Sequence, residues 1–126
     1  MGEPDTKSIL VVDDDADIRH SLTEILVDEG YDALTAGNGR EALSMIRANH
    51  LPSLIVLDLT MPIMDGYEAT RRIRANPDMT TIPIIAVTSY ALAGDEAKAL
   101  AAGCNAYVTK PFSPRALLAK VREYLA

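Results

Sequence analysis

The segment LIVLDLTMPIMDG, residues 54–66, joins a short apolar run to an aspartate and then to a helix-starting signal. Leu54–Leu57 is apolar without alternation, which is typical of a strand covered on both faces, as in a parallel sheet. Asp58 follows the run directly, and Asp65 precedes Gly66 as an N-cap residue would. The segment therefore predicts a buried parallel strand that ends in a carboxylate, followed by a loop and a helix.

Four further runs predict the rest of the sheet. Two are strongly apolar, one is weaker, and one is half polar and suits an edge strand: Ile9–Val12, Ile84–Val87, Ala106–Thr109 and Asp32–Ala36. Helical patterns of apolar residues lie between and after these runs. Because parallel strands require right-handed crossovers, five strand–helix units predict an α/β fold in which a five-stranded parallel sheet carries helices on both faces.

Capping residues mark where the helices begin and end. The fourth helix is expected over residues 91–102 and the last over residues 114–125. We expect N-caps at Asn38, Asp65 and Ser113, and helix-ending glycines at Gly30 and Gly103.

The composition bounds the class of protein. The chain has 126 residues, 48% hydrophobic and 24% charged, and no apolar run approaches the roughly 18 residues that span a membrane. We therefore expect one domain over residues 1–126, with a disordered tail at residues 1–7 and no contact with a membrane. A single cysteine, Cys104, favours a cytoplasmic location. The net charge of -6, without a Lys/Arg cluster, predicts no direct binding of nucleic acid.

Polar side chains follow four of the predicted strands at the same end. Asp13 and Asp14 come after the first strand, Asp58 after the third, Thr88 at the end of the fourth and Lys110 after the fifth. In open α/β sheets the ligand crevice lies outside the carboxyl ends of the strands. These side chains are therefore expected to meet in one site.

The residue types in this predicted site indicate its chemistry. Neighbouring carboxylates repel one another unless a cation compensates them. Oxygen ligands without His or Cys select a hard divalent cation, and Mg²⁺ suits phosphate partners best. With Lys110 as a second positive charge and the Thr88 hydroxyl nearby, the set can hold phosphoryl oxygens, and Asp58 is the candidate carboxylate nucleophile.

The chain resembles a response-regulator receiver domain of two-component signalling, of the single-domain, chemotaxis-regulator-like kind. The resemblance runs from Ser8 to Leu125 and implies a flavodoxin-like fold with strand order 2-1-3-4-5 and a cis peptide bond before Pro111. It depends on four ordered motifs: VVDDD at 11–15, LDLTMPIMDG at 57–66, AVTSYA at 86–91 and YVTKPF at 107–112.

The resemblance implies a role for each residue of the acidic site. Asp58 is expected to be the phosphoacceptor, and Lys110 to contact the phosphoryl oxygens. Mg²⁺ is expected to be bound directly by Asp14, through water by Asp13, and also by Asp58 and the backbone carbonyl of Thr60.

By the same resemblance the protein is a signalling switch rather than an enzyme, although it catalyses its own phosphorylation and dephosphorylation. A histidine kinase or histidine phosphotransfer protein would be the donor. Thr88 and Tyr107 would be the switch residues, and the face formed by helix four, strand five and helix five would regulate a downstream protein. Phosphorylation-dependent dimerisation is a further possibility, as is a place within a hybrid kinase or other multidomain regulator.

Three alternatives compete with these assignments. Asp13 and Asp14 would serve only as an N-cap cluster in one alternative, although Asp15 or Asp17 can cap the first helix instead. A calcium-binding EF-hand loop starting at Asp13 is disfavoured, because Ile18 occupies the position that requires glycine. An Asp-nucleophile phosphatase of the haloacid dehalogenase type would need a second carboxylate where this chain has Thr60.

Overall fold

The computed structural model describes residues 7–48, 51–61, 63–88, 95–110 and 113–125. Within these ranges, no helix is both long enough and apolar enough to cross a membrane. Three sequence-based expectations fall wholly or largely outside the described residues: the tail predicted over residues 1–7, of which only Lys7 is described, the start of the fourth helix at residues 91–94, and the peptide bond before Pro111.

The sheet confirms the predicted fold class. Its five strands are all parallel and lie in the order β2-β1-β3-β4-β5, and each begins and ends within one residue of the predicted run. The strands are β1 (Ser8–Val12), β2 (Asp32–Ala36), β3 (Leu54–Asp58), β4 (Ile84–Thr88) and β5 (Ala106–Thr109).

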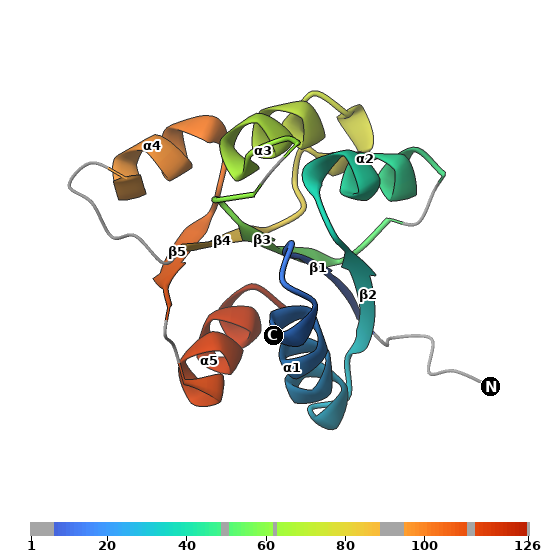
Figure 1. The fold of residues 1–126 in the computed structure, drawn as a ribbon, viewed down its shortest axis with the longest axis vertical. Coiled ribbons are helices and arrows are strands. Elements are labelled where there is room, and N and C mark those ends of the chain that lie inside the picture. The colour runs from blue at the N-terminus through green and yellow to red at the C-terminus, as the bar shows by residue number, and fades with distance from the viewer. Residues whose placement is uncertain (1–6, 49–50, 62, 89–94, 111–112, 126) are drawn as a thin grey trace.

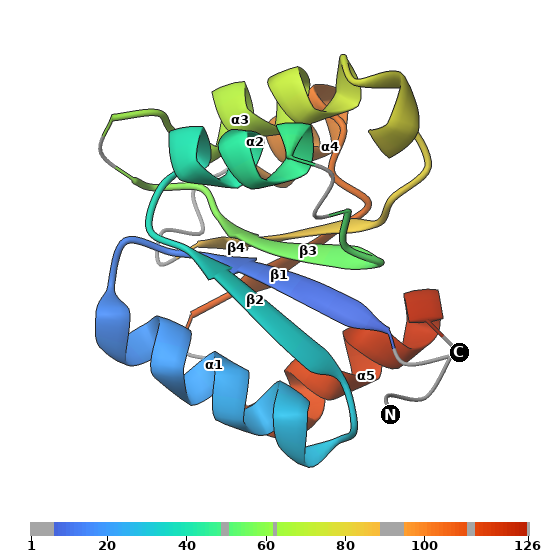
Figure 2. The same ribbon diagram turned by 90° about the vertical axis from the view of Figure 1, so that its right-hand side faces the viewer.

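Helices cover both faces of the sheet, as Figures 1 and 2 show: α1 and α5 on one face, α2, α3 and α4 on the other. A short 3₁₀ helix that the sequence patterns did not predict, Pro77–Met79, lies between α3 and β4. The helices are α1 (Ala16–Asp28), α2 (Gly39–Arg47), α3 (Gly66–Arg74), α4 (Asp95–Ala102) and α5 (Pro114–Leu125).

Capping contacts confirm five of the predicted helix ends within the described residues. The Asp65 carboxylate accepts a hydrogen bond from Glu68 N at 2.8 Å at the start of α3. Gly30 and Gly103 adopt φ values of 95° and 120°, which a residue with a Cβ rarely reaches, and so end α1 and α4. Side-chain caps also occur at Asn38 and Ser113.

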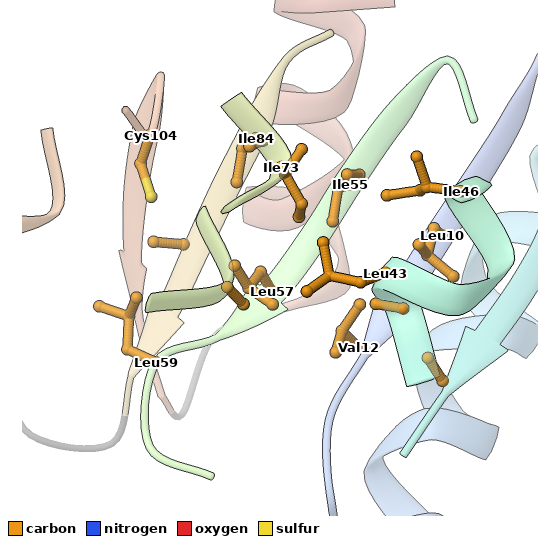
Figure 3. Packing of buried hydrophobic residues seen from close by; sticks show 14 of the residues in the cluster. Leu10, Val12, Leu43, Ile46, Ile55, Leu57, Leu59, Ile73, Ile84 and Cys104 are labelled. Carbon is orange, nitrogen blue, oxygen red and sulfur yellow. The ribbon is translucent and has the colours of Figure 1, made fainter. Parts of the chain in front are cut away.

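The strands are apolar on both faces because each face packs against helices. In β3, Ile55 and Leu57 belong to the cluster under α2, α3 and α4, whereas Leu54 and Val56 belong to the cluster under α1 and α5. Figure 3 shows the first cluster, in which Ile73 of α3 lies over the strands. Burial on both sides explains why the run has no polar alternation.

Arg74, the last residue of α3, holds together the end of the sheet that lies away from the carboxyl ends of the strands. Its guanidinium donates to the carbonyl oxygens of Met79 and Ile82 at 2.7 Å each, and to that of Gly103 at 3.0 Å. It also donates to Asn105 Oδ1 at 2.7 Å. We call this arrangement the Arg74 clamp; it ties α3 to the segment before β4 and to the link between α4 and β5.

Candidate functional site

A cleft opens at the carboxyl ends of β1, β3 and β5. Its lining includes five of the residues predicted for the site, together with two that follow Asp14 on the way into α1. The lining residues are Asp13, Asp14, Asp15, Ile18, Asp58, Thr60 and Lys110.

Strand register brings the acidic residues together. β1 pairs with β3 so that Val12 lies opposite Leu57. Asp13 and Asp58 follow these two residues directly, so their carboxylates emerge next to each other at the end of the sheet. Parallel pairing of β1 and β3 therefore brings Asp13 and Asp58 together, although they lie 45 positions apart in the chain.

Three carboxylates form the acidic centre of the cleft. One oxygen from each of Asp13, Asp14 and Asp58 lies within 4.8 Å of the others. Asp13 and Asp58 are only 2% and 5% exposed, whereas Asp14 is exposed. Buried carboxylates this close require positive charge nearby.

Lys110 supplies part of that charge. Its Nζ lies 2.9 Å from Asp13 Oδ2 and 3.7 Å from Asp58 Oδ2. Burial by itself would lower the pKa of Lys110, but the hydrogen bond to Asp13 and the charge of Asp58 outweigh it and raise the pKa above its ordinary value. Lys110 is therefore a fixed cation between two of the three acids.

The charge of Asp58 is not fully compensated in the protein alone. Burial, with the charges of Asp13 and Asp14, raises its pKa to about 6. The N–H of Thr60, which donates to Asp58 Oδ1 at 3.1 Å, and the charge of Lys110 lower the pKa by less. The site thus has room for more positive charge than Lys110 provides.

The donor set fits Mg²⁺. All candidate ligands are oxygens, as a hard cation requires. Asp13 already accepts hydrogen bonds on both oxygens, from Asp15 N at 2.9 Å and from Lys110, which suits a contact through water better than direct binding. In the described part of the chain no hydrogen bond or ion pair engages the Asp14 carboxylate, so both its oxygens are open to a cation.

Thr88 and Tyr107, the two predicted switch residues, are not among the residues that line the cleft. Thr88 is buried at the end of β4, and its carbonyl accepts a hydrogen bond from Lys110 N at 2.7 Å. Tyr107 is half-buried on β5, opposite Ala86, and packs against the cluster under α2, α3 and α4. The two residues are on neighbouring strands.

The structure decides between the alternatives for the acidic run after β1. Asp15 is the N-cap of α1 and accepts from the N–H groups of Asp17 and Ile18, which leaves Asp13 and Asp14 to the cleft. An EF-hand loop is excluded, because α1 begins at Ala16, within the twelve residues such a loop would need.

Sequence patterns missed two residues that shape the site. Arg19 Nη1 donates to the backbone oxygen of Asp13 at 2.7 Å. Gly66 packs against the end of β3 so closely that a Cβ there would lie 2.5 Å from the carbonyl oxygen of Asp58. The sequence analysis used Gly66 only to mark the start of a helix, and nothing in the sequence indicated that this position lies against the end of β3.

The chain matches the model of the response regulator receiver domain over residues 9–122. It is 33% identical over 120 residues to the polar-differentiation response regulator DivK of Brucella ovis, a match that covers 95% of this chain and 97% of that relative. It is 42% identical over 119 residues to the protein named "Probable transcriptional regulator ycf27" of Porphyridium aerugineum, covering 94% of this chain but 48% of that relative. The chain thus spans about half the length of the ycf27 relative.

Solved structures agree with this match. The fold superposes on the chemotaxis protein CheY4 of Vibrio cholerae with a TM-score of 0.87 and 31% sequence identity, covering 94% of this chain and 98% of that one. The flavodoxin-like strand order predicted from the motifs is therefore confirmed. The chain belongs to the family of response regulator receiver domains.

Proposed function

We propose that this receiver domain accepts a phosphoryl group on Asp58, with Mg²⁺ held by the neighbouring acids, from a histidine kinase or histidine phosphotransfer protein. The supporting observation is the acidic centre: three carboxylates have oxygens within 4.8 Å of one another, and Lys110 contacts two of them, Asp13 and Asp58. Asp14 would bind the cation directly, Asp13 through water, and Asp58 and the carbonyl of Thr60 would complete the set.

In the proposed reaction a carboxylate oxygen of Asp58 attacks the phosphorus of the partner's phosphohistidine. The O–P bond forms as the N–P bond breaks, and the electron pair of the broken bond stays on the imidazole. Mg²⁺, when bound, offsets the charge that the carboxylates and phosphoryl oxygens bring together. Lys110, already fixed by Asp13, donates to a phosphoryl oxygen.

Phosphorylation would act by changing the conformation of the protein surface that a downstream protein binds. Thr88 would move its hydroxyl toward the new phosphoryl group, and Tyr107 would turn inward to fill the space. The face formed by α4, β5 and α5 would then change its affinity for a downstream protein. A cytoplasmic location and phosphorylation-dependent dimerisation remain predictions.

The test is phosphorylation by a small donor. The chain is incubated with acetyl phosphate and Mg²⁺, and intact mass is measured for wild type, for Asp58→Asn and for wild type with EDTA. We expect one added phosphoryl group in wild type with metal only. An adduct on Asp58→Asn of equal yield would place the acceptor elsewhere.

Asp15→Asn is the matched control for this test. It removes a carboxylate that lines the same cleft, while asparagine keeps the N-cap of α1. Wild-type yield is expected. If wild type itself gains no mass, even from a phosphorylated histidine phosphotransfer protein, the phosphoacceptor proposal fails.

A second proposal is that this chain is the receiver domain of a longer regulator and accepts the phosphoryl group there in the same way. The likeness to ycf27, of which the chain spans about half, favours it. The haloacid dehalogenase alternative has no comparable support, because the position of its second carboxylate is held by Thr60 at the edge of the cleft.

A further inference from the structure

Arg19 reaches from α1 to the peptide that joins the two acids after β1. Its Nη1 donates to the carbonyl oxygen of Asp13 at 2.7 Å, and both residues are at least partly buried. This carbonyl belongs to the planar peptide unit whose other end is the nitrogen of Asp14. A hydrogen bond to it therefore limits the rotation of the backbone that carries Asp14.

Every polar group of Asp13 is engaged within the described part of the chain. Its N–H donates to Ala36 O at 3.2 Å, and its two carboxylate oxygens accept from Asp15 N and Lys110 at 2.9 Å each. Arg19 occupies the remaining carbonyl. Four hydrogen bonds, one at each polar group, therefore hold Asp13 in place.

Asp14 stands in contrast to Asp13. Among the described residues no side chain or backbone group holds its carboxylate, although this is the acid expected to bind the cation directly. The direction of the Asp14 carboxylate therefore depends on the backbone that carries it, beginning with the peptide that joins Asp13 to Asp14. The charged donor that fixes that backbone is Arg19.

We infer that Arg19 is a positioning residue of the metal site: by holding the peptide between Asp13 and Asp14, it keeps the Asp14 carboxylate directed at the cation. The inference rests on the proposed function, because it assumes that Asp14 is a ligand. Arg19 is not among the residues that line the cleft, so it would act through Asp14 and not by binding the cation itself. A charge-assisted bond to a carbonyl is stronger than a neutral one, which explains the use of arginine.

The experiment measures Mg²⁺ affinity by isothermal titration for wild type, Arg19→Ala, Arg19→Gln and Arg19→Lys. We expect Arg19→Ala to bind Mg²⁺ about tenfold more weakly, and Arg19→Lys, which keeps a cationic donor, to recover part of the loss, since removing a partner that orients metal ligands typically costs about 10- to 100-fold in affinity. Arg19→Gln is expected to fall between alanine and lysine, and it replaces alanine if that variant does not fold.

Arg122→Ala is the matched control. Arg122 also makes a 2.7 Å hydrogen bond, to Glu29 beyond the far end of α1, but lies away from the cleft. Wild-type Mg²⁺ affinity is expected. A second readout needs no metal: the amide resonance of Asp14 should shift in a ¹⁵N-correlated spectrum of metal-free Arg19→Ala and not in that of Arg122→Ala.

The outcomes separate this inference from the proposed function. If wild type binds Mg²⁺ and accepts phosphate, but Arg19→Ala binds Mg²⁺ within twofold of wild type, the positioning role is wrong and the phosphoacceptor proposal stands. An equal loss in Arg122→Ala would also overturn it, because the effect would then reflect general destabilisation. If wild type binds no Mg²⁺, the proposed metal site fails, and the positioning role with it.

Discussion

The charge state of Asp58 affects the stability of the metal-free protein. Its pKa lies at about 6 in the folded chain, against an ordinary value of 3.8, chiefly because it is buried. A carboxyl with a raised pKa stabilises the fold only while it is protonated. That contribution is complete below about pH 4 and is lost as the pH rises through about 6.

Asp58→Asn should therefore stabilise the metal-free protein at high pH. We expect a gain on the order of 3 kcal/mol in the free energy of unfolding at about pH 8, falling to near zero below about pH 4. Urea unfolding in EDTA across this range measures it, with the exposed Asp32→Asn as control. A gain that does not vary with pH would contradict the assigned cause.

The site residues differ in how far sequence could predict them. Asp13, Asp58 and Lys110 were predictable because strand ends in a parallel sheet must meet, so position along the chain determines position in space. The contact of Arg19 was not, because an arginine on a helix has many possible acceptors. Only the folded backbone determines that the carbonyl of Asp13 is the one within reach.

At the scale of single elements, Gly66 at the start of α3 allows the helix to approach the end of β3. A Cβ there would lie 2.5 Å from Asp58 O and 2.6 Å from Leu59 Cα, and backbone atoms cannot move aside cheaply. We expect Gly66→Ala to lower the free energy of unfolding by about 2 kcal/mol or more. Thermal or urea unfolding measures the loss.

Gly37→Ala is the control for Gly66→Ala. The nearest atoms to its added Cβ, on the side chains of Arg19 and Glu41, lie at 3.5 and 3.6 Å, which is ordinary contact. A small effect is expected. If both alanine variants lost the same stability, the close approach of α3 to β3 would not be the cause.

The loop between β3 and α3 contains a strained residue. Ile63 has a φ of 72°, a left-handed conformation that is unfavourable for a β-branched side chain, and it is 71% exposed, so packing gives little in return. Asparagine tolerates this conformation, and we expect Ile63→Asn to stabilise the protein by about 1 kcal/mol. Chemical unfolding measures the gain.

Val27→Asn is the comparison for Ile63→Asn. Val27 is likewise an exposed apolar residue, at 51%, but lies within α1, where asparagine brings no relief of strain. No stabilisation is expected there. Stabilisation of both variants would point to loss of surface hydrophobicity instead of relief at Ile63.

Elements were predictable to within a residue wherever the signal was local. β3 and the N-cap at Asp65 follow from a dense apolar run and a short-range hydrogen bond. The 3₁₀ helix at Pro77–Met79 was missed, because three residues carry no periodicity. The left-handed backbone at Ile63 was missed because nothing in that residue favours it.

For the molecule as a whole, the Arg74 clamp joins segments that are distant in the chain. Arg74→Lys cannot reproduce four donor contacts from one planar group, and we expect a loss of about 3 kcal/mol in the free energy of unfolding. Arg72→Lys is the control, since Arg72 is exposed and its described contact is an ion pair with Glu68 at 2.9 Å. Equal losses in the two variants would contradict the clamp.

The contacts of the chain differ between the two ends of β5. At one end Asn105 is tied to Arg74 and to the start of β4; at the other, Lys110 faces the acidic cleft. If phosphorylation of Asp58 moves β5 as proposed, Asn105, the residue just before that strand, would stay held by Arg74 and serve as a fixed point. Motion of β5 and α4 would be a rotation about that point rather than a sliding of the whole layer, so a small displacement at the cleft would have its largest effect at the start of α4.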